Sequence, residues 1–475
     1  MAIFRQPGVY FTENIQSVGS TAFGFNRTAV IGLGQTYTNV SNLELVKSNS
    51  SAEESGDVLA ESGDSNFDYI LLPDGTIASP SDILSVDGIG NIPGYFNYTA
   101  NIDYTINELD DKAVITWLGD NKPVANSTFY ISYKLNKSEL RGDYDPKLLF
   151  NPSAIKKTYG PEYLNGVIQP LTLAADLVLE GQTLLGGGVY CVQVTSDTEA
   201  AYKAAIDKLM KINVQTVMIL KQDSLSLRNY LIQSIETCSS DLYGKERTTF
   251  IVPDSVELPV ETMVAQREGL KNTRVTYFCN KLCTINLTDE ITQESENVVL
   301  NAIYACCNLA GIEGNPDYTY SEPMLRKKLS SRITLVGDQI LDPSERNYYC
   351  SNFLSAFDFD ENTNLTNVFD IYTTDDTNVI TETRAVRRVT DLLRTDLRKQ
   401  LATYIGQKTS GATASSAQVR TQSILQNYVI AEEIKDYQNV KSSFDKNNPK
   451  QLNISFDYIP LFETKYVHVT LNINI

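Results

Sequence analysis

Hydrophobic and polar positions follow two different periods along the middle of this chain. Short apolar runs rich in β-branched residues indicate buried strands, whereas apolar positions spaced three and four apart indicate amphipathic helices. The expected strands are residues 28–34, 188–195, 214–220, 248–252 and 274–279, and the expected helices are residues 199–212, 225–243, 260–270 and 294–310. Because strands and helices follow one another in turn, the pattern predicts an α/β layer built on a largely parallel sheet.

A different pattern occupies residues 37–144, which are rich in Ser, Asn, Asp and Gly. Residues 48–64 are polar and acidic and indicate an exposed loop. Beyond them, short β-like runs are separated by turn residues such as Pro73-Asp74-Gly75, which is typical of consecutive strands. These runs are residues 69–72, 103–106, 113–117 and 129–135. The region is therefore predicted to be a small all-β domain inserted into a larger fold.

The C-terminal part of the sequence predicts two helices followed by two strands. Residues 381–405 carry one apolar stripe at helical spacing, which includes Val386, Leu393 and Leu401. The further expected elements are a loop at residues 406–416, a helix at residues 417–435, a polar linker at residues 442–451, and strands at residues 452–458 and 466–475.

Together these patterns predict a multidomain chain of the α/β (α+β) class. Its expected parts are an N-terminal arm with the first core strand (residues 1–36), an inserted outer β-domain (37–144), a central α/β domain (145–375) and a C-terminal α+β domain with a terminal strand arm (376–475). A length of 475 residues is enough for several such domains, each with its own core.

The final segment alternates strictly between aliphatic and polar residues. The aliphatic side chains point to one face of the predicted strand, while His468 and the other polar residues point to the opposite face. The aliphatic positions are Val467, Val469, Leu471, Ile473 and Ile475. Such a face needs a surface to cover it, and the linker at residues 442–451 could span about 30 Å when extended. The strand can therefore complete a sheet of its own chain or of a neighbouring molecule.

The charge of the chain limits its possible partners. The sequence contains 40 Lys and Arg against 58 Asp and Glu, a formal net charge of −18. This balance argues against direct nucleic-acid binding, because phosphates require a basic surface. The sequence has no run of 18 apolar residues, so no membrane insertion is expected, and its N-terminal residues lack the basic and apolar regions of a signal peptide.

The residue types that usually carry catalysis form no recognisable motif in this sequence. It has no GxxxxGK[ST] phosphate-binding loop and no GxSxG nucleophile motif, and Gly32 and Gly34 lack the third glycine of a dinucleotide site. The single histidine is His468, and seven cysteines without a CxxC pair indicate reduced, buried thiols rather than a zinc site. No cofactor and no metal ion are expected. Carboxylate-based catalysis leaves an α/β enzyme with a β accessory domain as an alternative.

Four segments, taken in their order along the chain, resemble the contractile tail sheath proteins of myovirus-type bacteriophages and the related sheaths of pyocin-like particles and type VI secretion systems. PGVYFTEN at residues 7–14 is similar to the N-terminal signature of that family, and TAVIGLG at residues 28–34 is similar to the strand after it. Residues 103–134 resemble a β-domain inserted in phage sheaths. Residues 378–399, with the later helix and the closing strand pair, match the family's C-terminal region in order and character.

The resemblance implies a structural subunit without enzymatic activity. Six subunits are expected to form a ring, and rings to stack helically around an inner tube, so that contraction drives the tube through the host envelope. The expected partners are other copies of the chain, the tail tube protein, and baseplate and tail terminator proteins. The expected location is the tail of a phage virion, assembled in the host cytoplasm. The sheath of a bacteriocin or of a secretion machine is the alternative within this class.

The resemblance also implies which residues act in assembly. Terminal arms are expected to complete sheets in adjacent subunits by β-strand addition. The arms are Pro7, Gly8, Val9, Tyr10 and Phe11 at one end and Val467, Val469, Leu471, Ile473 and Ile475 at the other. Basic side chains of the helix at residues 381–405 either form a solvent-exposed face balanced by Asp391 and Asp396 or face an acidic tube. These side chains are Arg384, Arg387, Arg388, Arg394, Arg398 and Lys399.

Overall fold

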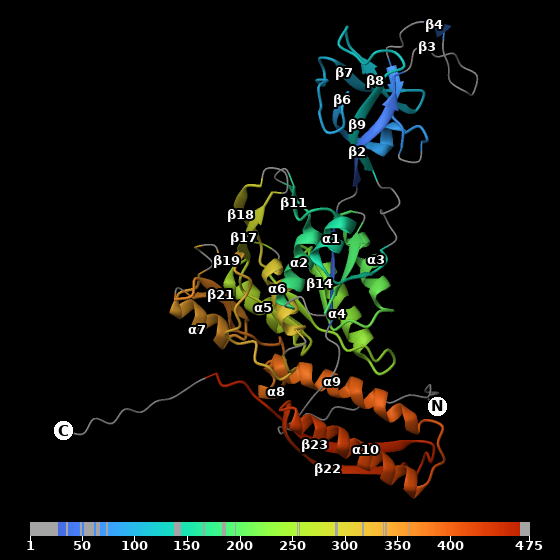
Figure 1. Ribbon diagram of the computed structural model, residues 1–475. Helices are drawn as coiled ribbons and strands as arrows, with labels where there is room; N and C mark the ends of the chain where they lie inside the picture. The colour runs from blue at the N-terminus through green and yellow to red at the C-terminus, as the bar shows by residue number, and fades with distance from the viewer. Residues whose placement is uncertain are drawn as a thin grey trace, which may run out of the picture. The chain divides into compact units, whose positions relative to one another are not determined.

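A computed structural model describes residues 27–465 of the chain, apart from short gaps (Figure 1). The gaps are residues 35–36, 48–49, 52–60, 63–66, 73–74, 137–143, 165–166, 183–186, 195, 254, 256, 290–292, 316–317, 336, 338–339 and 361. The two predicted arms, residues 7–11 and 467–475, lie outside the described residues, as does His468. The chain divides into two compact units, one of Gln35–Asp143 and one of Met1–Gly34 with Tyr144–Ile475.

The centre of the larger unit is a four-stranded sheet in the order β10, β13, β1, β14. β1 (Thr28–Leu33) runs parallel to both of its neighbours, β13 (Val189–Val194) and β14 (Thr216–Ile219). β10 (Lys147–Leu149) is an antiparallel edge strand beside β13. β1 is buried on both faces, which explains why its sequence is a continuous apolar run rather than an alternating one.

Helices cover both faces of this sheet. On one face, α3 (Glu199–Leu209) and α4 (Leu225–Ser239) bury an apolar cluster against β1, β13 and β14. On the other face, α2 (Pro170–Gly181) and α6 (Ile303–Glu313) form the largest apolar cluster of the chain's described part. These two helices can pack closely because Gly311 has no side chain. A Cβ at this position would lie only 2.1 Å from the backbone oxygen of Val178.

The remaining elements extend this layer. β15 (Thr249–Ile251) and β16 (Val275–Tyr277) are parallel to each other, and a parallel bridge between Thr216 and Thr248 joins them to β14. The fold-class prediction, a mixed α/β chain with a largely parallel central sheet, is therefore confirmed. The elements of this part not named above are α1 (Pro152–Tyr159), β11 (Tyr163–Leu164), β12 (Val167–Ile168), α5 (Val260–Leu270), β17 (Leu282–Thr288), β18 (Ser295–Asn301), β19 (Ile333–Thr334), α7 (Pro343–Ser351), β20 (Ala356–Asp360) and β21 (Leu365–Asp370).

The helix expected at residues 294–310 is wrong in its first half. Residues Ser295–Asn301 form β18, which pairs antiparallel with β17 over its whole length, and α6 begins only at Ile303. Asn301 marks the change, since its side chain accepts a hydrogen bond from the Ile303 amide at 2.9 Å. The apolar Val298–Leu300 run reads as either strand or helix by sequence alone, and cross-strand pairing decides between them.

The smaller unit consists of antiparallel strands. β2 (Tyr37–Val46), β9 (Thr128–Asn136) and β6 (Ile83–Gly90) form one sheet, and β5 (Phe67–Tyr69), β8 (Lys112–Trp117) and β7 (Tyr104–Leu109) form another. Trp117 is the centre of its core, with edge-on ring contacts to Tyr98, Tyr104 and Phe129. The Trp117 indole donates a hydrogen bond of 2.6 Å to Asp68, which also pairs with the buried Lys47. Three short elements complete the unit: β3 (Ser50–Ser51), β4 (Glu61–Ser62) and the 3-10 helix η1 (Pro80–Asp82).

Candidate assembly site

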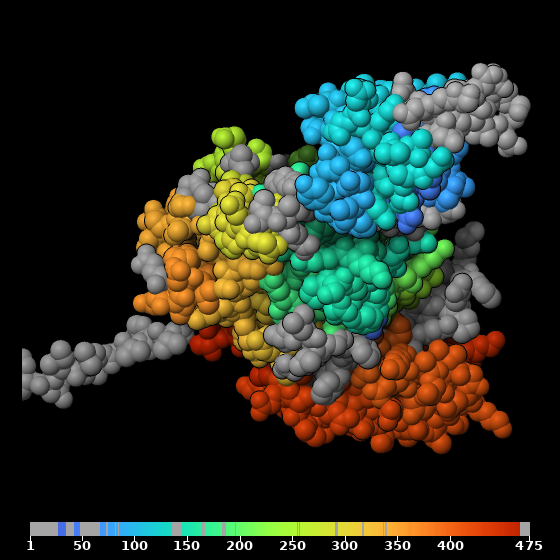
Figure 2. Space-filling view, turned by 45° about the horizontal axis from the view of Figure 1, so that its top comes forward, coloured from blue at the N-terminus to red at the C-terminus, as the bar shows by residue number. Residues whose placement is uncertain are grey.

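The C-terminal module, residues 384–460, has a core of its own. It contains α9 (Arg384–Leu401), η4 (Ala402–Tyr404), α10 (Gly411–Ile430), β22 (Ile434–Phe444) and β23 (Leu452–Pro460). Figure 2 shows these elements, in orange and red, gathered into one body at the edge of the larger unit. The buried residues of the cluster are Leu392, Leu393, Leu397, Leu401, Ile424, Leu425, Tyr428, Ile434 and Val440.

The two helices expected in the module are both present, but their limits differ from those predicted. α10 begins at Gly411 because the Ser410 side chain accepts a hydrogen bond from the Thr413 amide at 3.2 Å and caps the helix. The loop expected at residues 406–416 is therefore shorter, and Gly406 takes the left-handed backbone conformation that the turn requires.

The predicted tether at residues 442–451 is wrong. β22 extends to Phe444 and pairs antiparallel with β23, so these residues close a β-hairpin. Asp445 holds the turn, since its carboxylate accepts hydrogen bonds from the amides of Asn447 at 2.7 Å and Asn448 at 2.9 Å. Only residues 461–465 then separate β23 from the predicted terminal strand.

The hairpin offers two open strand edges within the described part of the chain. β22 and β23 form a two-stranded sheet, and neither has a second strand partner among those residues. One face of the sheet packs on the module core through Ile434, Val440 and Ile454. Two-stranded hairpins are marginal by themselves, and the unpaired backbone groups of a free edge are a template for another strand. The hairpin is therefore a candidate acceptor for strand addition.

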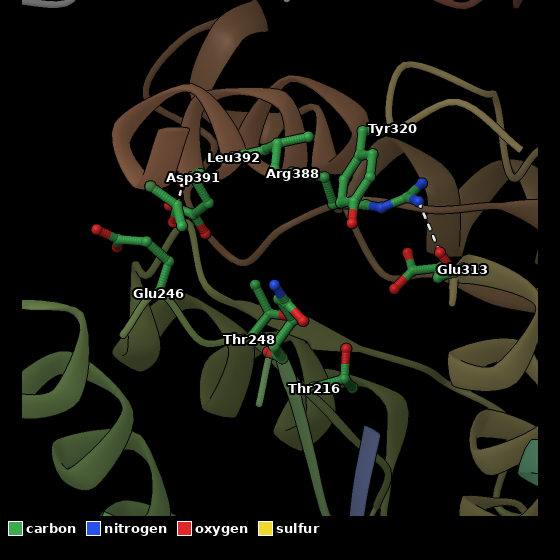
Figure 3. Close-up of a pocket in the computed structure, with 10 residues that line it drawn as sticks. Thr216, Glu246, Thr248, Glu313, Tyr320, Arg388, Asp391 and Leu392 are labelled. Carbon is green, nitrogen blue, oxygen red and sulfur yellow. Dashed lines mark hydrogen bonds between the residues drawn. The ribbon is translucent and has the colours of Figure 1, made fainter. Parts of the chain in front are cut away.

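The opposite side of α9 meets the α/β layer through charged groups (Figure 3). We call this contact the α9 seam. Its guanidinium groups belong to Arg274, Arg384, Arg387, Arg388, Arg394 and Arg398, and its carboxylates to Asp241, Glu246, Glu313 and Asp391.

Arg384 anchors the seam at the start of α9. Its Nε and Nη2 donate to the two oxygens of Glu313 at 2.7 and 2.8 Å, and its guanidinium lies 3.9 Å from the ring centre of Phe250. Burial opposes the ionisation of Glu313, but the charges of Arg384 and Arg388 outweigh it and lower the pKa of this carboxyl. The pair is thus a fully buried, ionised contact between α9 and the end of α6.

Further along α9, Glu246 of the layer and Asp391 of α9 are shared between several arginines. Arg274 bridges Asp391 and Glu246, at 2.7 Å from each. Arg394 and Arg398 also pair with Glu246, at 3.2 and 3.3 Å. Burial raises the pKa of Glu246, and the charge of Asp391 raises it further, while the surrounding arginines lower it. The Asp391 carboxylate is in addition bonded to Arg387, one turn earlier on the same helix.

Arg388 differs from the other arginines of the seam because its hydrogen bond goes to a backbone oxygen and not to a carboxylate. Its Nη2 donates to the backbone oxygen of Glu313 at 3.0 Å, and its guanidinium lies beside the ring of Tyr320. Its Nε and Nη1 are buried and have no hydrogen-bond partner among the described residues. A cavity of about 20 Å³, enough for one water molecule, lies next to it and is also lined by Thr248 and Leu392.

These contacts differ from the exposed basic face considered above. Arg384, Arg387 and Arg388 are buried, and Arg394 and Arg398 are mostly covered. Four of these arginines pair with carboxylates of their own chain, and Arg388 donates to a backbone oxygen. Their principal acids, Glu246 and Glu313, are distant in sequence, which is why local charge counting did not find them. Lys399 alone among the six candidates is exposed.

The exposed charges of the module are nevertheless basic around the turn between α9 and α10. Lys399, Lys408 and Arg420 are exposed, and residues 397–431 contain no Asp or Glu. The exposed surface of this stretch therefore carries only positive side-chain charges, in a chain with an overall charge of −18. Such a surface favours an acidic partner.

Metal ligands, thiols and apolar helices were the remaining features to place among the described residues. No group of three or more His, Cys, Asp or Glu among them is arranged to hold a metal ion. The seven thiols are free, and six are buried, with burial raising the pKa of Cys283 and Cys350 to about 12. No helix in the described part is long and apolar enough to cross a membrane.

Comparison with known proteins gives likeness of fold but not of sequence. No protein-family model and no curated protein sequence matches the chain. The contracted helical sheath of the anti-feeding prophage matches with a TM-score of 0.57 at 10% identity, covering 99% of each chain. The contracted sheath of PVC, an extracellular contractile injection system, matches with a TM-score of 0.58 at 8% identity, covering 100% of this chain and 99% of that one.

A third match comes from the six-fold symmetrised baseplate of the anti-feeding prophage. Its TM-score is 0.54 at 11% identity, and it covers 70% of this chain and 88% of the other. Because two of these likenesses extend over the whole chain, this protein has the fold of contractile sheath proteins. The family resemblance seen in the sequence is confirmed at the level of the fold.

Proposed function

We propose that this chain is a non-enzymatic structural subunit of a contractile sheath. The observation that carries the proposal is the likeness of fold, over the full chain, to two sheaths in the contracted state. Six subunits would form each ring, and the rings would stack helically around an inner tube. Contraction of this array would drive the tube through the envelope of a target cell.

Strand addition at the hairpin is the proposed link between subunits. The open edges of β22 and β23 would accept the arms of neighbouring subunits, Pro7–Phe11 and Val467–Ile475. The ladder would then grow from two strands to three or four, which is the range in which a sheet becomes stable. The aliphatic face of Val467, Val469 and Leu471 would continue the apolar face formed by Ile454 and Phe456.

Attachment to the tube is proposed for the exposed basic turn of the module. Lys399, Lys408 and Arg420 would face acidic groups of the tube protein, in place of the five seam arginines. Since the charges are exposed, their contribution would be to positioning and would weaken with salt. Baseplate and tail terminator proteins would close the two ends of the stack, without nucleic-acid contact or membrane insertion by this subunit.

The kind of particle has two candidates. The inserted β-unit resembles those of phage sheaths and favours a phage tail, assembled in the host cytoplasm. The matches to the anti-feeding prophage and to PVC favour the sheath of an injection particle. Both candidates use the same subunit chemistry.

Negative-stain electron microscopy of the purified chain tests the proposal. We expect rings or hollow helical tubes that grow with protein concentration. A monomer that stays monodisperse at every concentration, or one that turns over a substrate, would contradict it.

A further inference from the structure

The polypeptide connects the C-terminal module to the α/β layer at one end of α9 only, and the other contacts between them are non-covalent. The chain enters it after α8 (Val379–Glu382) and leaves it after Pro460. The exit lies against the entry, since Lys465 Nζ donates to Asp370 at 2.7 Å and lies 3.7 Å from the ring centre of Tyr372. Both chain crossings are therefore beside the Arg384 end of α9.

The entry segment is itself fixed to the layer. The amide of Thr374 donates to the backbone oxygen of Val275 at 2.8 Å, and the amide of Thr373 donates to Glu382 at the same distance. Asp376 pairs with the buried Arg267 at 2.8 Å. The bonds of Thr374 and Asp376 join the entry segment to the layer, and the bond of Thr373 to Glu382 closes the entry segment on itself.

The other end of α9 has no covalent link to the layer. Arg398 is 14 positions after Arg384, about 21 Å along the helix axis. The contact there includes Arg394 and Arg398 with Asp241 and Glu246 at 3.1–3.6 Å, and Arg398 with the backbone oxygen of Gly244 at 3.2 Å. Arg394, Arg398 and Asp241 are partly exposed, so water and salt reach the pairs with Asp241, whereas Glu246 is buried.

The apolar clusters of the described residues extend across the seam at one side chain only. The apolar cluster of the module takes in one described residue from the layer, Tyr320, and the clusters of the layer contain none from α9. Separating an apolar interface exposes hydrocarbon to water, whereas separated ion pairs regain their hydration. The buried, unpartnered nitrogens of Arg388 and the adjacent cavity show that the seam is also incompletely satisfied.

We propose that the C-terminal module is a hinged domain. It turns about the crossings at residues 370–383 and 461–465, and the pairs of Arg394 and Arg398 with Asp241 and Glu246 form a clasp that opens at the far end. The hairpin edges belong to this module and move with it. If a neighbouring subunit's strand is bound at the hairpin, as the proposed function has it, opening would move that strand relative to the α/β layer.

Spin-label distance measurements on the full chain test this hinge. Leu242→Cys, beside the clasp and exposed, and Lys408→Cys, on the exposed turn of the module, carry the labels in a Cys350→Ser background. A large excess of unlabelled chain removes distances between subunits. In the parent we expect one dominant distance at low salt, with a longer population that grows as NaCl is raised.

The clasp variant is Arg394→Gln with Arg398→Gln, which leaves Glu246 paired with Arg274. We expect the longer population to increase about tenfold, because the variant loses the four ion pairs of the clasp, two of which involve the partly exposed Asp241. Arg332→Gln is the matched control, because Arg332 has similar exposure and bridges Glu162 and Glu180 away from the seam. It should leave the distance distribution unchanged.

The inference is overturned if the parent at high salt and the clasp variant both keep the single parental distance. The salt series on the parent decides the matter even if the variant does not fold. The outcome is separate from that of the proposed function: a locked module in a chain that forms sheaths refutes the hinge alone. A chain that opens at the clasp but never polymerises refutes the sheath assignment alone.

Discussion

Glu313, the last residue of α6, receives two hydrogen bonds from Arg384, the first residue of α9, and both groups are buried. This contact joins the α/β layer to the module that carries the candidate strand acceptor. If one partner is removed, the charge of the other stays buried, and water cannot hydrate it.

Glu313→Gln should therefore lower the free energy of unfolding by about 3–5 kcal/mol, since Arg384 remains buried without its carboxylate. Urea unfolding followed by far-UV circular dichroism measures the change. Asp145→Asn is a suitable control, because Asp145 pairs with Lys208 at an exposed site and its loss should have a far smaller effect. Equal losses in both variants would contradict a structural role for the buried pair.

Asp176 should make stability depend on pH near neutrality. Burial, and then the charge of Glu162, raise the pKa of this carboxyl to about 7, and its Oδ1 has no hydrogen-bond partner among the described residues. The folded chain thus holds a proton that the unfolded chain releases near 3.8, the ordinary pKa of an aspartate. Stability from this group should fall by about 1.4 kcal/mol per unit as the pH rises from about 4 to about 7, and then level off.

Asp176→Asn should remove that part of the pH dependence. Thermal unfolding of both chains over the same pH range provides the test. A variant with the parental slope would show that Asp176 is ionised throughout the range and that other groups cause the dependence.

Gly311→Ala should separate α2 from α6 and cost about 1–3 kcal/mol, because the added Cβ would meet the backbone oxygen of Val178 at 2.1 Å. Gly269→Ala in α5 is the matched control, with no atom within 4 Å of the added Cβ. A helical Gly-to-Ala change without a clash should stabilise the chain by up to about 1 kcal/mol. Melting temperatures that shift in opposite directions are the expected result.

Charge reversal at the exposed basic turn should affect attachment but not folding. We expect Lys399→Glu, Lys408→Glu and Arg420→Glu together to weaken co-sedimentation with tube polymers at low salt, while the melting temperature stays within about 2 °C of the parent. The difference from the parent should shrink as NaCl is raised. Unchanged co-sedimentation at low salt would place the tube contact elsewhere.

The α/β layer was predictable from sequence because its signals are local. The apolar runs of β1, β13 and β14 are buried on both faces, so each is visible in the sequence without knowledge of its partners. β22 was not predicted, because only Ile434 and Val440 of its eleven residues are buried and the rest carry no apolar alternation. β22 is a strand because it pairs with β23, and neither segment taken by itself has a sequence pattern that predicts this pairing.

The seam was beyond the sequence for a different reason. Arg384 and Arg388 lie on a helix with few local acids, which made an exposed basic face a reasonable expectation. Their partners come from Glu313, 71 positions from Arg384, and from the ring of Tyr320. The fold alone brings these groups together, and helical spacing gives no signal of it.

Assembly by exchange of the terminal strand is tested most directly with a chain that ends at Lys465, compared with the full chain by negative-stain microscopy. This truncation removes the aliphatic strand and keeps the contact of Lys465 with Asp370. Leu471→Asp on the proposed inward face and Asn472→Asp on the opposite face provide a matched pair in the full chain. We expect the truncated chain and Leu471→Asp to fold with the parental melting temperature but to form no rings or tubes, while Asn472→Asp assembles normally. Sheaths of normal length from the truncated chain would contradict assembly by exchange of the terminal strand.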